Sequence, residues 1–169
     1  EAKNLAISLP ALKGWIDELI VLDSGSTDDS RQLVESAGGQ WFVNTNWQGF
    51  GKQRQLAQSY ATGDWILALD ADEEITPQLK QSILEVIAQP PANTVYGIKR
   101  IDCIFGHEID NSYWALKAHW RLYPKTFQYN DNLVHESVEL NGAVTQTLKG
   151  TMLHHTADTP QFWLDKRLQ

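Results

Sequence analysis

In Trp65-Ile66-Leu67-Ala68-Leu69-Asp70-Ala71-Asp72-Glu73-Glu74, five residues suited to a buried strand are followed by two carboxylates at positions i and i+2. A continuous apolar run is typical of a strand that is buried on both faces, and open α/β sheets bind ligands beyond the carboxyl ends of such strands. There, Asp70 and Asp72 would repel each other and lose hydration unless a cation or a hydrogen-bond donor compensates. A divalent metal ion that carries phosphate oxygens would do both.

The same stretch also allows a structural turn, because acidic residues commonly precede helices. Thr76 is expected to cap a helix that begins at Pro77, and Glu73 and Glu74 are interpreted as charges that favour the positive end of that helix. A calcium loop is excluded, because the glycine and the glutamate that it needs at its sixth and twelfth positions are absent. On these residues alone, the metal site and the structural turn both remain open.

Composition narrows the class of protein. The chain has 169 residues, enough for one domain with a sizeable core, and a formal net charge of −7 argues against a nucleic-acid partner. The longest apolar stretch is shorter than the roughly 18 residues of a membrane span, and no signal peptide is recognisable. Cys103 is the single cysteine, which excludes a disulfide framework and favours a reducing cytoplasm.

One segment of this acidic chain is basic and aromatic, and it indicates an anionic substrate, although a solvated face explains any single one of its charges. Its cations fall within 27 positions: Lys99, Arg100, Lys117, Arg121 and Lys125.

The order of elements predicts an α/β domain whose mostly parallel sheet is flanked by helices. Such a domain normally opens with a strand, whereas this chain opens in a helix, so a first strand is expected to be missing at the N-terminus. The expected helices are 2–13 with a break at Pro10, 28–37, 52–62 and 77–89, and the expected strands are 18–22, 40–43, 64–69 and shorter ones near 95–101, 120–123 and 136–140.

Asp23 ends one predicted strand as Asp70 ends another, so both acids are expected at the same edge of the sheet. An alternative interpretation is a helix cap, with Ser26 as the capping residue and Asp29 three positions later. Dinucleotide and Walker-type phosphate loops are excluded, because the run 49–54 lacks a third glycine and its lysine is followed by glutamine.

Taken in order, Asp23-Ser24-Gly25-Ser26-Thr27-Asp28, Gly49-Phe50-Gly51-Lys52-Gln53 and 63–74 resemble family 2 inverting glycosyltransferases of the A-type fold (GT-A), in particular the branch with lipopolysaccharide-core glucosyltransferases. The resemblance implies a GT-A-like domain with a nucleotide-sugar-binding half, 1–91, and an acceptor-binding half, 92–169. It also implies donor contacts and a metal ion, Mn²⁺ or Mg²⁺, with these roles: Asp23 on the base or ribose, Lys52 or Arg54 near the nucleotide, Asp70 on the ribose and Asp72 on the metal.

The second half is expected to supply the acceptor chemistry. Val134-His135-Glu136-Ser137 resembles the His-Glu motif of the branch, and an inverting transfer needs a base for the proton of the acceptor hydroxyl. Glu136 is the preferred base and His135 the alternative. If a strand begins here, the two side chains point to opposite faces and only one of them meets the substrate. His154 is a candidate for the metal shell or the diphosphate, and Arg121 for balancing phosphate charge.

Other functions use the same residues differently. Trp114 and Trp120 suit stacking on sugar rings in a carbohydrate-binding module without catalysis, and a truncated, inactive relative is a further alternative. A sugar nucleotidyltransferase would use similar nucleotide and metal chemistry, but its glycine-rich basic loop is not visible. The preferred function is the one that the resemblance implies, an inverting transfer from a nucleotide-sugar donor such as UDP-glucose to a saccharide or glycolipid acceptor of the lipopolysaccharide inner core. This would take place in the cytoplasm, with peripheral contact at the inner membrane face.

Overall fold

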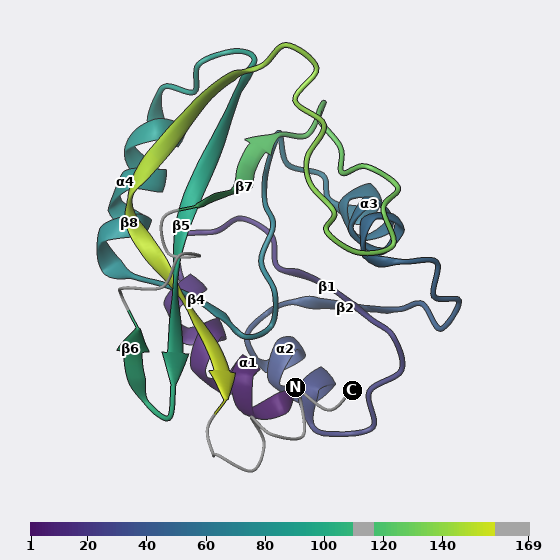
Figure 1. The fold of residues 1–169 in the computed structure, drawn as a ribbon. Helices are drawn as coiled ribbons and strands as arrows, with labels where there is room; N and C mark the ends of the chain where they lie inside the picture. The colour runs from purple at the N-terminus through teal and green to yellow at the C-terminus, as the bar shows by residue number, and fades with distance from the viewer. Residues whose placement is uncertain (110–116, 158–169) are drawn as a thin grey trace.

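The computed structural model describes residues 1–109 and 117–157, and it confirms the α/β class expected from the sequence (Figure 1). The chain begins with a helix that changes to a 3-10 turn at Leu9–Leu12, as the proline there predicts, and β1 then ends at the expected aspartate. Apart from β4, the first half continues as predicted in type and order. Its elements are α1 (Ala2–Ser8), β1 (Ile20–Asp23), α2 (Ser30–Ser36), β2 (Gln40–Val43), α3 (Phe50–Tyr60), β3 (Trp65–Leu67), β4 (Glu73–Ile75) and α4 (Pro77–Ala88).

The second half is built from strands: β5 (Thr94–Ile104), β6 (His107–Ile109), β7 (Ala118–Pro124) and β8 (Val144–Ala157). β4, β6 and β8 were not expected from the sequence. The strand expected over 136–140 is absent, and only an isolated bridge joins Tyr129 to Val138. None of the described helices is long and apolar enough to cross a lipid bilayer.

The strands pair differently from the mostly parallel sheet that the sequence predicted. β1 and β2 form a parallel two-stranded sheet, while a six-stranded sheet has the order β3-β7-β5-β8-β4 with β6 against β5. Among the described strands of the larger sheet, only β5 and β8 pair in parallel. For one antiparallel pair the connection gives the physical reason, because a short turn can join only antiparallel strands, whereas parallel strands need a long crossover. This pair is β5 and β6, which are joined through Phe105 and Gly106, both with positive φ, at 53° and 77°.

Helix α4 packs on the large sheet through its apolar face. Thr76 caps the helix as predicted, since its hydroxyl oxygen accepts a hydrogen bond from the Leu79 amide at 3.3 Å. Leu79 and Ile83 are buried against Ile98 and Met152 of the sheet. Burial of a side chain of this size contributes about 1.5–3 kcal/mol, so this face holds the helix to the sheet.

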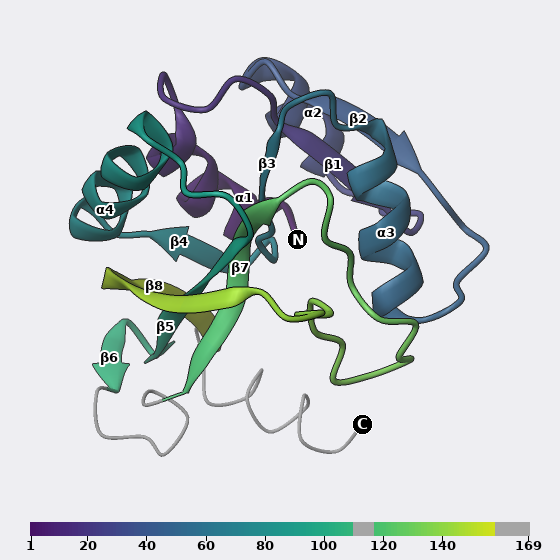
Figure 2. The ribbon, with the colours of Figure 1, turned by 90° about the horizontal axis from the view of Figure 1, so that it is seen from above.

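Helices α3 and α4 lie on opposite sides of the molecule, with β3, β5 and β7 between them (Figures 1 and 2). Strand β3 pairs with β7, and β4 pairs with β8, so the turn between β3 and β4 crosses from one part of the sheet to the other. That turn carries Asp70 and Asp72. The fold thus brings these carboxylates close to side chains from β5, β7, β8 and α3.

Candidate active site

An open cavity of about 470 Å³ lies beyond the end of β3, within the usual size range of small-ligand sites. It contains most of the residues that the sequence singled out, although they come from positions as far apart as 54 and 154. The residues lining it are Glu1, Phe50, Arg54, Asp70, Ala71, Asp72, Val134, His135, Glu136 and His154.

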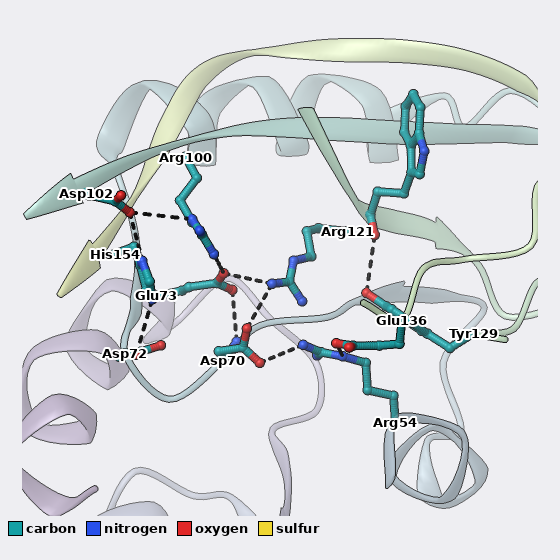
Figure 3. Close-up of polar contacts among 11 residues, drawn as sticks. Arg54, Asp70, Asp72, Glu73, Arg100, Asp102, Arg121, Tyr129, Glu136 and His154 are labelled. Atoms are coloured by element: carbon teal, nitrogen blue, oxygen red, sulfur yellow. Dashed lines mark hydrogen bonds and ion pairs between the residues drawn. The ribbon is translucent and has the colours of Figure 1, made fainter. Parts of the chain in front are cut away.

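Two arginines hold Asp70 (Figure 3). Arg54 Nη2 donates to Asp70 Oδ1 at 2.6 Å, and Arg121 Nη2 donates to Asp70 Oδ2 at 2.9 Å. Burial alone would raise the pKa of Asp70, but the charges of Arg121 and Arg54 outweigh burial and hold this pKa below its usual range. Asp70 is therefore a fixed anion, and each of its oxygens keeps a lone pair for a ligand hydroxyl.

Glu73 is a buried partner of Arg121, so its interpretation as a charge at a helix terminus is wrong. Its side chain lies in β4 and is 1% exposed, accepting from Arg121 Nη2 at 2.7 Å and from the Asp70 amide at 2.9 Å. Burial raises the pKa of Glu73 despite the nearby Arg121. Glu74 also lies in β4, ahead of the helix, where its carboxylate contacts His155. Both glutamates therefore contact residues of neighbouring strands and do not lie in the first turn of α4.

Asp72 and His154, the two residues predicted for a metal shell, lie together in the cavity. His154 Nε2 is 3.3 Å from Asp72 Oδ2, and the other ring nitrogen, Nδ1, is 2.8 Å from Asp102 Oδ1. Burial lowers the pKa of the imidazole, but the carboxylates of Asp72 and Asp102 outweigh burial, and the net pKa is raised. This arrangement, a carboxylate oxygen and an imidazole nitrogen directed at one point, suits a divalent ion.

The protein side of such a metal site would be sparse. Among residues 1–109 and 117–157, no group of three histidine, cysteine, aspartate or glutamate side chains has the arrangement of a metal site. Mg²⁺ is commonly bound by one or two carboxylates together with substrate phosphates and water. Asp72 and His154 therefore fit an ion that takes its remaining ligands from a bound diphosphate.

Glu136 and His135 both line the cavity, contrary to the expectation that only one of them would. That expectation assumed a strand, whereas His135 has a left-handed backbone with φ of 57°. Glu136 is the more enclosed of the two, 14% exposed, and its Oε1 accepts from Arg54 Nε at 2.8 Å. Arg54 thus touches Asp70 and Glu136 at once, and its guanidinium also lies 5.0 Å from the centre of the Tyr129 ring.

The glycine motif Gly49-Phe50-Gly51 brings Glu136 to Arg54. The Phe50 and Gly51 amides donate to the carbonyl oxygens of Leu133 and Asn132, both at 3.1 Å, which ties the start of α3 to the loop before Glu136. A Cβ on Gly51 would lie 2.0 Å from the carbonyl oxygen of Asn130. Only glycine allows this approach, so the motif has a packing role that sequence reasoning did not assign.

Three predicted donor residues do not line the cavity. The Asp23 carboxylate accepts from the amides of Gly25 and Ser26 and from the Ser26 hydroxyl, so the predicted cap by Ser26 does not form. Burial raises the pKa of Asp23, but these hydrogen bonds outweigh burial and the net pKa is lowered.

The other two predicted donor residues outside the cavity are held in ion pairs. Lys52 pairs with Asp131 at 2.7 Å. Arg121 is buried, with its guanidinium directed to Asp70 and Glu73.

Sequence reasoning named Arg100 only as one cation of the basic segment and did not name Asp102, although both residues contact the predicted ones or their partners. Arg100 Nη1 is 3.8 Å from Glu73, and Arg100 Nε is 3.7 Å from Asp102, which in turn contacts His154. Arg100 and Asp102 are two positions apart in a strand, which indicates that both side chains point to the same face. Their partners could not be inferred, because those partners lie on strands that the sequence did not reveal.

Comparison with known proteins agrees with this geometry. The family model described as "Glycosyl transferase family 2" matches residues 1–141. An uncharacterized glycosyltransferase of Rickettsia felis is 32% identical over 164 residues, which is 93% of this chain and 57% of that protein. The lipopolysaccharide core biosynthesis glycosyltransferase LpsC of Rhizobium meliloti is 27% identical over 143 residues, 81% of this chain and 53% of LpsC. This chain thus spans little more than half of either relative.

Solved structures resemble the fold as well. The crystal structure of TarS 1-349 from S. aureus in complex with UDP superposes with a TM-score of 0.60 at 16% identity, covering 96% of this chain and 59% of that one. A second TarS structure gives a TM-score of 0.61 at 17% identity, over 96% of this chain and 36% of that one. The GT-A-like fold expected from the sequence is thereby confirmed. The family model covers most of the chain, and the chain belongs to glycosyl transferase family 2.

Proposed function

We propose that this chain carries the donor site and the catalytic base of an inverting glycosyltransferase. The observation that carries the proposal is the shared cavity, in which Asp72 and His154 offer ligands for a metal ion and Glu136 offers a carboxylate. Asp70 and Arg54 lie between these groups and hold one another (Figure 3). Single-displacement glycosyl transfer needs this combination of a site for a leaving diphosphate and a base for the attacking hydroxyl.

The donor in this proposal is a nucleotide diphosphate sugar, UDP-glucose or a similar compound. The UDP complex of TarS, a protein of the same fold, supports a uridine nucleotide. Asp72 and His154 would hold Mn²⁺ or Mg²⁺, which when bound neutralises charge on the leaving diphosphate. Asp70 is assigned to a ribose hydroxyl, because it is a fixed anion with free lone pairs at the cavity. Asp23 and Lys52 lie outside that cavity. A contact of Asp23 with the nucleotide base or ribose, and a place for Lys52 near the nucleotide, remain part of the proposal.

Glu136 is assigned the role of base, with His135 as the alternative. Because Arg54 holds Oε1 of Glu136, its Oε2 is left for the hydroxyl of the acceptor. As the acceptor oxygen bonds to the anomeric carbon, the bond from that carbon to the diphosphate oxygen breaks and the hydroxyl proton passes to Glu136. Inversion follows, since attack and departure take place on opposite faces of the sugar.

The acceptor is proposed to be a saccharide carried by a glycolipid, with the inner core of lipopolysaccharide as the specific candidate. The similarity to LpsC supports this class of acceptor. The reaction is accordingly expected in the cytoplasm, at the inner face of the membrane. In the same proposal residues 1–91 bind mainly the donor and residues 92–169 bind mainly the acceptor. Two residues of the second half, His154 and Arg121, nevertheless belong to the donor site, because they contact Asp72 and Asp70.

The donor site is tested by calorimetry of UDP binding with and without Mn²⁺. Asp72→Asn is expected to abolish the Mn²⁺-dependent part of UDP affinity, while Asp131→Asn, on an exposed carboxylate outside the cavity, should retain it. An unchanged Mn²⁺ dependence in Asp72→Asn would remove the metal assignment. Incubation with UDP-glucose is the companion experiment: release of UDP supports a transferase, release of pyrophosphate a nucleotidyltransferase, and saccharide binding without either product a binding module.

A further inference from the structure

Asp102 lies directly behind His154, on the side away from Asp72. Register pairs Asp102 of β5 with His154 of β8, and His154 with Glu73 of β4, so the three side chains form one row across the sheet. The contact between Asp102 and His154 is drawn in Figure 3. Asp102 and His154 are 21% and 17% exposed, so most of this contact is removed from solvent.

The imidazole of His154 has one carboxylate at each ring nitrogen. Nδ1 is 2.8 Å from Asp102 Oδ1, and Nε2 is 3.3 Å from Asp72 Oδ2. A neutral imidazole carries a single N–H, so the two carboxylates compete for one proton. The nitrogen without the proton presents a lone pair, and a metal ion can bind only there.

We propose that Asp102 is a positioning residue that keeps the proton on Nδ1 of His154 and thereby leaves Nε2 free to bind a divalent metal ion together with Asp72. The inference rests on the proposed function for its metal ion, but the placement of the proton is a property of the metal-free protein. A carboxylate behind a metal-binding histidine sets the orientation and the tautomer of the ring in many metal sites.

Asp102 holds the stronger position in this competition. Its contact with the ring is 0.5 Å shorter than that of Asp72. Asp102 lies where β5 pairs with β6 on one side and with β8 on the other, and Arg100 Nε is 3.7 Å from the same Oδ1. Asp72 lies in the turn ahead of β4. A strand flanked on both sides and an adjacent cation hold the Asp102 carboxylate in place, whereas the turn leaves Asp72 more freedom to meet an ion.

Loss of Asp102 would therefore do more than remove one hydrogen bond. Asp72 would become the remaining carboxylate beside the ring, and the proton would move to Nε2, where it is shared with Asp72. Both metal-binding atoms would then be engaged with each other. Mutation of such supporting residues typically weakens metal affinity by about 10–100-fold.

The neighbouring residue pair His155 and Glu74 offers a matched control. His155 Nε2 lies 2.9 Å from Glu74 Oε2, a contact as short as that between Asp102 and His154. Adjacent strand residues point to opposite faces, so this pair lies across the sheet from His154, and neither residue lines the cavity. Glu74→Ala removes a carboxylate from a histidine in the same strand without touching the proposed metal site.

The experiment compares the wild type with Asp102→Ala, Asp102→Asn and Glu74→Ala. Nitrogen-15 NMR of the metal-free proteins, recorded at rising pH until the ring signals of His154 stop shifting and the imidazole is neutral, reports which ring nitrogen carries the proton. Calorimetry with Mn²⁺ in the presence of UDP gives the metal affinity, and thermal melting verifies folding. We expect a proton on Nδ1 in the wild type and on Nε2 in Asp102→Ala, with Mn²⁺ affinity lower by about 10–100-fold. Asp102→Asn retains an acceptor oxygen and should preserve both the tautomer and most of the affinity.

Four outcomes would overturn the inference. The first is a proton that stays on Nδ1 in Asp102→Ala, with Mn²⁺ affinity within twofold of the wild type. The second is an equal loss of affinity in Glu74→Ala, which would indicate a general effect on the sheet. The third is absence of Mn²⁺ binding by the wild type in the presence of UDP, which would also remove the metal from the proposed function. A loss of transfer activity in Asp102→Ala at unchanged Mn²⁺ affinity would refute the inference and leave the proposed function standing.

Discussion

Arg121→Met is expected to lower the free energy of unfolding by about 3–5 kcal/mol. Arg121 is 6% exposed and donates to Asp70 at 2.9 Å and to Glu73 at 2.7 Å. Methionine has a similar apolar stem but no charge, so the variant leaves two carboxylates close together and Glu73, which is 1% exposed, without its shortest ion pair. Removal of one partner from a buried pair is costly because the other charge stays buried.

The size of the expected stability loss depends on how buried the two carboxylates are and on the cations that remain beside them. Arg54 still pairs with Asp70, and Arg100 is 3.8 Å from Glu73, so part of the charge is compensated and the lower end of the range is expected. At about 2–4 °C per kcal/mol for a domain of this size, the melting temperature should fall by roughly 6–12 °C. Arg121→Lys keeps the charge but loses the planar fork, so we expect a loss of about 1–2 kcal/mol.

The assay is urea denaturation followed by circular dichroism, with thermal melting as a second measure. Arg31→Met is the matched control, because Arg31 pairs with Glu35 on an exposed helix face at 2.8 Å. Such surface pairs contribute about 0–1 kcal/mol, so this variant should remain within about 0.5 kcal/mol of the wild type. If Arg121→Met lowers the free energy of unfolding by less than about 1 kcal/mol, or by no more than Arg31→Met does, the argument that the buried ion pairs of Arg121 with Asp70 and Glu73 stabilise the fold is refuted.

Three further predictions concern other parts of the chain. Glu136→Gln should lower turnover by roughly 10²-fold or more with donor affinity unchanged, as measured by steady-state kinetics and UDP calorimetry. Glu139→Gln, which changes an exposed neighbour, should have near-normal turnover. Normal turnover in Glu136→Gln would assign the role of catalytic base to another residue. Gly51→Ala should destabilise the fold by about 1–3 kcal/mol, because its Cβ would lie 2.0 Å from a backbone carbonyl oxygen. Gly63→Ala, where the nearest atom is 3.9 Å away, should differ from the wild type by less than about 0.5 kcal/mol, and equal effects of the two would contradict the packing role. His119 has a pKa lowered to about 4 by burial and nearby arginines, so the unfolded chain takes up its proton near pH 6.5 before the folded protein does. Stability should therefore fall from pH 6.5 toward pH 4, with up to about 3 kcal/mol from this residue, and urea denaturation of His119→Gln should show a shallower fall; an identical fall would exclude the assignment.

Much of the site could be predicted because its residues belong to short patterns. The carboxylates Asp70 and Asp72 follow an apolar strand, and their position at a ligand-binding edge follows from that order alone. The structure agrees, since both line the cavity together with Glu136 and His154. The contact between Arg54 and Glu136 could not be predicted, because 82 positions separate them in the sequence.

Glu73 illustrates why local reasoning failed beside the site. Its place before a capped helix made a role in the helix dipole reasonable, and the cap by Thr76 does form. The carboxylate instead lies in β4, an element only three residues long that exists because β8 pairs with it. A strand this short leaves no readable period in the sequence, so its partner had to be known first.

The sequence by itself determined the helices, the order of the first strands, the family resemblance and the acidic residues beyond β3. These features depend on hydrophobic periodicity, capping and turn residues, all of which act over a few neighbouring positions. Tertiary structure alone decided that β3 pairs with β7, that β8 lies between β4 and β5, and that Asp102 contacts His154. Pairing between distant strands depends on the packing of the whole sheet, and a single side chain gains its partner only when that packing is complete.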